Sequence, residues 1–209
     1  LLDDGNAAGL ALIVTAIALF LTGAFPLVLR RLAEREGARA SASPSLSSQH
    51  AYARLTPDLV LDAIDSTGLR TDGRMLALNS FENRVFQLGL EADKVGAGDT
   101  AANWVVAKFY RPERWSDAAI LEEHAFTAEL AAREIPVVPP LRIEGTTLHR
   151  HADFRFAVFP RQGGRAPELD RAGTLEWLGR FLGRIHAIGR LEPFRHRTEL
   201  DIASFGEEP

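Results

Sequence analysis

The sequence predicts an α+β fold built from short strands and two long amphipathic helices, with an apolar helix in front of them. Three observations support this prediction. Residues 104–112 are a β-rich run that contains one lysine, Lys108; residues 117–133 repeat apolar side chains at the period of a helix; and residues 7–29 contain no charged side chain. The other segments are assigned relative to the lysine-bearing strand and the helix that follows it.

Composition narrows the class of protein before any motif is considered. The chain has 209 residues, enough for one domain or one and a half, and its 46% hydrophobic and 25% charged residues are typical of a globular protein. The formal net charge of -4 gives no electrostatic reason to expect nucleic-acid binding. The absence of cysteine excludes disulfides and thiolate metal sites, which suits a reducing cytoplasm. Because the chain begins with Leu1 and not with methionine, we expect a fragment or a processed product.

The uncharged residues 7–29 predict a transmembrane helix. A helix of this length would extend about 35 Å, against a hydrocarbon core of about 30 Å. Acidic residues precede it and Arg30, Arg31, Arg35 and Arg39 follow it, so we expect its C-terminal side and the rest of the chain in the cytoplasm. A cleaved signal peptide fits less well because no basic region precedes the apolar run, and a helix buried inside the protein is the other alternative.

The remaining segments are assigned in chain order. Residues 1–40 are the span and its basic flank, and residues 41–50 are a serine-rich linker. Thr56 and Pro57 begin a helix that ends near Gly68. The further predictions are strands at 75–78 and 84–88 with a loop at 79–83, a polar connection at 91–103, an extended segment at 135–140, a hairpin at 141–148 around Gly145, a strand with Phe154, Phe156 and Val158 on one face, and an amphipathic helix at 174–189.

Lys108 lies where a buried strand should carry no charge. A buried lysine costs several kcal/mol unless a fixed negative group meets it. The helix that follows, with Ser116 as its N-cap, offers Glu123 from its apolar side, whereas Glu122 and Glu129 fall on the opposite side. The apolar stripe around Glu123 consists of Ile120, Phe126 and Leu130. The pattern predicts an ion pair between Lys108 and Glu123; the alternative is an edge strand whose lysine reaches water.

The predicted pair lies among five short motifs, at residues 79–86, 106–115, 120–124, 156–160 and 163–165. Together they resemble the stress response kinase A family of bacterial serine/threonine protein kinases, within the aminoglycoside phosphotransferase-like group. The run Lys-Phe-Tyr-Arg-Pro-Glu-Arg-Trp from Lys108 is the most specific part. The resemblance extends roughly from His50 to Arg197 and does not include the apolar segment.

This resemblance implies a protein-kinase-like N-lobe and hinge over residues 51–165, with a five-stranded antiparallel sheet and a helix of the αC type, followed by the start of a C-lobe over 166–209. It implies transfer of the γ-phosphoryl group of Mg-ATP to protein serine or threonine. Lys108 would hold the α- and β-phosphates, and Glu123 would orient Lys108.

The resemblance also implies nucleotide contacts outside the ion pair. Ser80 and Asn83 would lie in the loop that covers the phosphates, and the backbone from Val158 through Phe159 to Arg161 would bind the adenine edge. Residues 79–83 are not glycine-rich, so an ordinary polar hairpin is the alternative for that loop.

Other groups of the family are absent from this chain. The family's proton-accepting aspartate and its Mg²⁺ ligands lie in His-Gly-Asp-x-x-x-x-Asn and Asp-Leu-Asp motifs. No asparagine follows Asn103, and Asp170 and Asp201 have no partner at the required spacing. We therefore expect the chain to be incomplete and inactive, with its Mg²⁺ ligands in a missing C-lobe and no metal ligand of its own.

The sequence leaves two other functions open. One is a small-molecule phosphotransferase of the same fold, acting on an amino alcohol or an aminoglycoside. The other is a membrane-tethered, non-catalytic module that binds a nucleotide or a protein partner. ATP is the expected ligand, and the sequence does not identify the phosphate acceptor.

Overall fold

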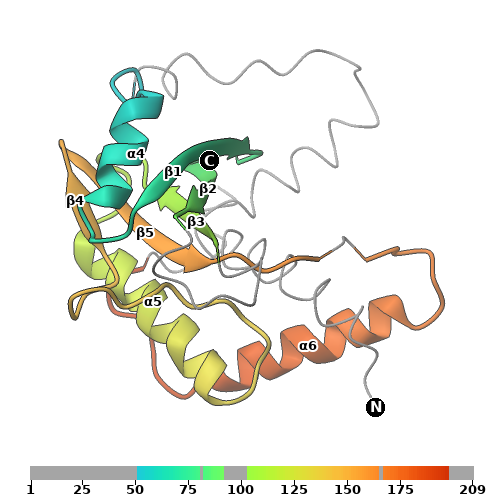
Figure 1. Ribbon diagram of the computed structural model, residues 1–209. Helices are drawn as coiled ribbons and strands as arrows, with labels where there is room; N and C mark the ends of the chain where they lie inside the picture. Colours follow the sequence, from blue (N-terminus) through green and yellow to red (C-terminus); the bar gives the residue numbers. More distant parts are fainter. Residues whose placement is uncertain (1–50, 81, 92–102, 165–166, 198–209) are drawn as a thin grey trace, which may run out of the picture.

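The computed structural model describes residues 51–80, 82–91, 103–164 and 167–197 (Figure 1). The predicted span at 7–29 and the linker at 41–50 lie outside these residues. Over the described ranges, no helix is long and apolar enough to cross a membrane. The elements are α4 (Pro57–Asp65), β1 (Thr71–Leu78), β2 (Arg84–Leu90), β3 (Trp104–Phe109), α5 (Asp117–Ala132), β4 (His149–His151), β5 (Phe154–Pro160) and α6 (Thr174–Gly189).

The strands form one sheet in the order β1-β2-β3-β5-β4, and every neighbouring pair is antiparallel. The predicted five-stranded antiparallel sheet is therefore confirmed. Its central strand is β3, in which Lys108 lies opposite Val85 of β2 and Ala157 of β5. A lysine in the central strand has neighbours on both sides, which excludes the edge-strand alternative.

The two faces of the sheet pack against different helices. Val105, Ala107 and Phe109 of β3 belong to a core that includes Val60 and Ile64 of α4. Because side chains alternate along a strand, Lys108 projects to the other face, which α5 covers. Figure 1 shows α4 and α5 as separate helices beside the sheet.

Side-chain caps begin α4 and α5 where the sequence predicts them. The Thr56 hydroxyl accepts a hydrogen bond from the Leu59 N–H at 3.3 Å, and Pro57 occupies the first turn. The Ser116 hydroxyl accepts one from the Ala119 N–H at 3.2 Å. These bonds satisfy donors that a helix start leaves unpaired, and α5 ends within one residue of the predicted boundary.

Two strand predictions need correction. β1 begins at Thr71, earlier than the predicted 75, and its register shifts around Gly73, whose φ of 83° suits glycine. The predicted hairpin at 141–148 is reduced to a single bridge between Ile143 and Thr146. The strand that pairs with β5 is instead β4, three residues long.

Helix α6 packs against the C-terminal end of α5. Leu130 and Ile135 form a small core with Phe181 and Ile185 of α6. After α6 the chain turns back, and Phe194 packs edge-on against Phe126 of α5 with ring centroids 5.1 Å apart. Residues 191–197, which we name the return segment, thereby lie against α5 (Figure 1).

Candidate functional site

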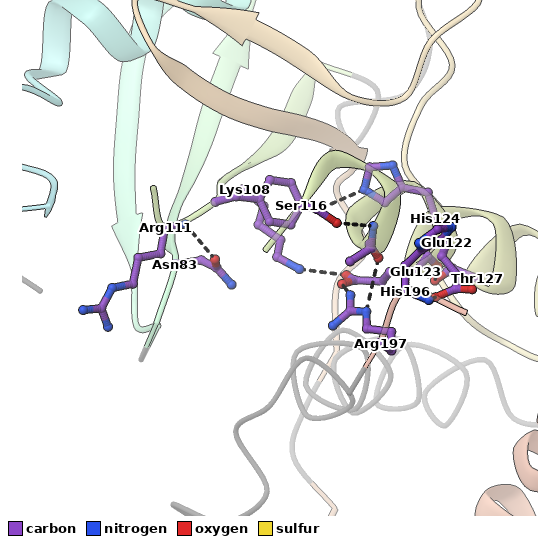
Figure 2. Close-up of polar contacts among 12 residues, drawn as sticks. Asn83, Lys108, Arg111, Ser116, Glu122, Glu123, His124, Thr127, His196 and Arg197 are labelled. Atoms are coloured by element: carbon purple, nitrogen blue, oxygen red, sulfur yellow. Dashed lines mark hydrogen bonds and ion pairs between the residues drawn. The ribbon is translucent and has the colours of Figure 1, made fainter. Parts of the chain in front are cut away.

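The predicted ion pair between Lys108 and Glu123 is present. The Lys108 Nζ lies 2.8 Å from Glu123 Oε1, and the two side chains are only 6% and 10% exposed (Figure 2). The strand period directs Lys108 toward α5, and the phase of the helix directs Glu123 back toward the sheet. A buried charge pair of this kind is stable only because each charge meets the other.

The neighbouring Glu122 has different partners. Its carboxylate accepts hydrogen bonds from the backbone N–H groups of Arg195 and His196, at 2.6 and 3.0 Å. Burial alone would raise the pKa of Glu122, but these two donors together with nearby cationic side chains outweigh burial and lower it. Glu122 therefore holds the return segment and, as predicted, does not pair with Lys108.

Arg197 provides a second cation for Glu123. Its Nη2 contacts Glu123 Oε2, and its side chain is 10% exposed. Its Nε donates to the Ala119 carbonyl at 3.2 Å, and its guanidinium lies 4.5 Å from the centre of the Trp115 ring. Sequence analysis missed Arg197, because it is 74 residues from Glu123 and no local pattern links the two.

His124 forms a buried polar link beside the ion pair. Its Nε2 lies 2.7 Å from the Tyr110 hydroxyl, and its Nδ1 lies 2.8 Å from the Thr147 hydroxyl. Burial lowers the pKa of His124 to about 4, so the imidazole is neutral at physiological pH. His124 thus joins the end of β3, α5 and the loop before β4. Sequence analysis also missed it, although Ile120, His124 and Thr127 share a helical spacing.

The ion pair lines a cleft that is partly open to solvent. The walls of the cleft are mainly apolar and carry a few polar groups. This combination is typical of sites that bind small molecules. The lining residues are Val85, Val106, Lys108, Glu123, His124, Thr127, Val138, Pro140, Phe159, Pro160 and Gln162.

Comparison with known proteins identifies the family. Residues 77–206, more than half of the chain, match the model of the phosphotransferase enzyme family. The chain belongs to this phosphotransferase family.

Relatives of this chain have kinase names. The chain is 41% identical over 158 residues to stress response kinase A of Salmonella choleraesuis. This match covers 76% of the chain and 45% of the relative. The chain is 41% identical over 163 residues to stress response kinase A of Escherichia coli K12, covering 78% of the chain and 47% of the relative. Serine/threonine protein kinase RdoA of Salmonella typhimurium is 40% identical over 158 residues. The chain spans about half the length of these relatives.

A solved structure confirms the kinase-like fold. An amicoumacin kinase in complex with AMP-PNP, Ca²⁺ and Ami superposes with a TM-score of 0.55 at 22% identity. The superposition covers 70% of this chain and 44% of the amicoumacin kinase. At this identity the likeness concerns the fold alone.

The three residues predicted to form the hinge differ in their surroundings. Phe159 lines the cleft. The Val158 side chain lies in the opposite core, and its carbonyl accepts a hydrogen bond from the Leu141 N–H at 2.7 Å. The contact of this backbone with an adenine edge stays a prediction. Arg161 is exposed just after β5, and the next residue, Gln162, lines the cleft.

Ser80 and Asn83 form hydrogen bonds within and next to their own loop. The Ser80 hydroxyl donates to the Asn83 carbonyl at 2.6 Å. Asn83 Oδ1 accepts a hydrogen bond from the Arg111 N–H at 3.2 Å (Figure 2). Asn83 is buried, and neither residue is among those that line the cleft. Their contact with phosphate stays a prediction.

Proposed function

We propose that this phosphotransferase chain binds ATP in the cleft between the sheet and α5, as the nucleotide-binding half of a protein serine/threonine kinase. The observation that carries the proposal is the buried pair of Lys108 and Glu123 at the cleft. Lys108 donates to the α- and β-phosphates, and Glu123 holds its ammonium group in place.

The charges at the cleft favour an anionic ligand. Lys108 and Arg197 carry two positive charges and Glu123 carries one negative charge, so the buried group has a net charge of about +1 while His124 is neutral. A phosphate group complements this charge in a site where water screens it weakly.

The walls of the cleft favour a flat base beside the phosphates. Val85 and Val106 come from neighbouring strands, and Phe159 and Pro160 come from the end of β5. An adenine ring packed among these side chains would reach the backbone that follows Pro160, near Gln162.

Protein serine or threonine as the acceptor is supported by the names of the relatives, which are kinases 40–41% identical to this chain. In the described ranges no three acidic or histidine side chains gather to hold a metal ion. Phosphoryl transfer in kinases takes place with Mg²⁺ bridging the phosphates.

A calorimetric titration with ATP tests the proposal. The chain contains two lysines, Lys94 and Lys108, so Lys94→Met is a matched control for Lys108→Met. Loss of a charge-assisted contact of about 1.5–3 kcal/mol predicts about a ten- to hundredfold weaker affinity for Lys108→Met. Lys94→Met should bind as the unsubstituted chain does. Equal affinities of all three proteins, or no binding by any, would overturn the proposal.

A further inference from the structure

We propose that Arg197 is a positioning residue for the phosphate-binding lysine, and that it acts through Glu123 from the return segment. The inference rests on the proposed function, because it assigns Arg197 a role in the ATP affinity of Lys108. Arg197 itself is not among the residues that line the cleft.

The return segment contacts one stripe of α5. Its Phe194 packs on Phe126, its backbone N–H groups at Arg195 and His196 bind Glu122, and its Arg197 binds Ala119 and Glu123. The four α5 positions are Ala119, Glu122, Glu123 and Phe126, which fall within an arc of about 100° around the helix, with Glu122 and Glu123 at its two edges. The segment therefore fixes both the rotation and the position of α5.

The Glu123 carboxylate is held at both oxygens. Oε1 bonds Lys108, and Oε2 contacts Arg197 (Figure 2). Without Arg197 the carboxylate would keep one partner, and the side chain would be free to rotate about its bonds. Lys108 would then lose its fixed position relative to the phosphates, although its charge would be unchanged.

A buried arginine at this position contributes little net stability. Its desolvation opposes its Coulomb attraction to Glu123, and apolar residues often stabilise such a site equally well. The contact with Trp115 offsets part of that cost. A role in fixing the direction of Glu123 explains why a charged side chain occupies this position.

The experiment compares ATP with adenosine, which lacks the phosphates. Arg197→Met should weaken ATP binding about five- to twentyfold and adenosine binding less than twofold, because only the phosphates reach Lys108. Arg197→Lys keeps the charge and should recover part of the ATP affinity. Arg190→Met, at an exposed arginine after α6, removes the same charge and should change neither affinity. Circular dichroism and thermal unfolding establish that each variant is folded.

The outcomes separate this inference from the proposed function. If the unsubstituted chain binds ATP no better than Lys108→Met does, the proposed function fails. If Lys108→Met weakens ATP binding but Arg197→Met does not, the inference alone fails. Equal losses for ATP and adenosine would indicate a purely structural role and also overturn it. If Arg197→Met does not fold, Arg197→Lys decides: the inference requires a loss for ATP that adenosine does not share.

Discussion

The three-membered ion network predicts an unequal response to the loss of its members. Lys108→Met leaves Glu123 paired with Arg197, so no buried charge is stranded. Glu123→Gln leaves two buried cations, Lys108 and Arg197, around one neutral amide. Glu123→Gln should therefore destabilise the protein more than Lys108→Met does.

The magnitudes follow from burial, since the three side chains are 6–10% exposed. Stranding a buried charge costs about 3–5 kcal/mol, which we expect for Glu123→Gln. Lys108→Met removes a charge-assisted bond but also the desolvation of an ammonium group, so we expect a loss below about 2 kcal/mol. At about 2–4 °C per kcal/mol for a chain of this size, the melting temperature should fall by about 6–20 °C and by less than about 8 °C, respectively.

The assay is urea-induced unfolding followed by circular dichroism. The slope of the unfolding free energy against urea concentration must be the same for all variants. The double variant Lys108→Met/Glu123→Gln leaves one cation and should be more stable than Glu123→Gln alone. Glu129→Gln is the control: Glu129 is 41% exposed and pairs with Arg133, so its loss should cost about 0.5 kcal/mol or less. A Lys108→Met variant less stable than Glu123→Gln would refute the reasoning.

Three further predictions concern His124, catalysis and the apolar segment. The pKa of His124 is about 4 in the folded protein, whereas the ordinary value of 6.5 applies to the unfolded chain. Between these two pH values the unfolded chain binds more protons than the folded protein does. About 3 kcal/mol of stability should therefore be lost as the pH falls from about 6.5 to 4. His124→Gln should lack that part of the pH dependence in urea unfolding at a series of pH values; an unchanged profile would contradict it. The 209-residue chain alone should transfer no phosphate from ATP, because no asparagine follows Asn103, and magnesium-dependent labelling above background would show otherwise. Residues 7–29 should anchor the chain in the cytoplasmic membrane with Arg30 on the cytoplasmic side, and its release by carbonate washing would contradict this.

The parts of the site that sequence could predict are those fixed by local periods. The alternation of a strand places Lys108 on one face, and the phase of a helix places Glu123 toward it. The caps at Thr56 and Ser116 depend on hydroxyl groups within three residues of their partners, so they too are visible in the sequence.

The parts that sequence missed depend on distant packing. Arg197 reaches Glu123 only because the return segment folds back after α6. The sequence alone does not distinguish Arg197 from the other arginines as a partner of Glu123. The Val158 carbonyl is occupied because Leu141 lies beside β5, a contact that no local pattern encodes. The hairpin predicted around Gly145 forms instead between β4 and β5, where Ala152 and Asp153 make the turn with φ values of 44° and 73°; a positive φ is uncommon for alanine.

The central claim is that ATP binds with its phosphates at Lys108, and covalent labelling tests it most directly. An adenosine-derived sulfonyl fluoride reacts with a lysine amine next to a bound adenosine, forming a sulfonamide and releasing fluoride. With only Lys94 and Lys108 in the chain, peptide mass spectrometry assigns the modified residue without ambiguity. The account predicts modification of Lys108 that ATP suppresses. Equal modification of Lys94 and Lys108, or modification of Lys108 that ATP leaves unchanged, would contradict it.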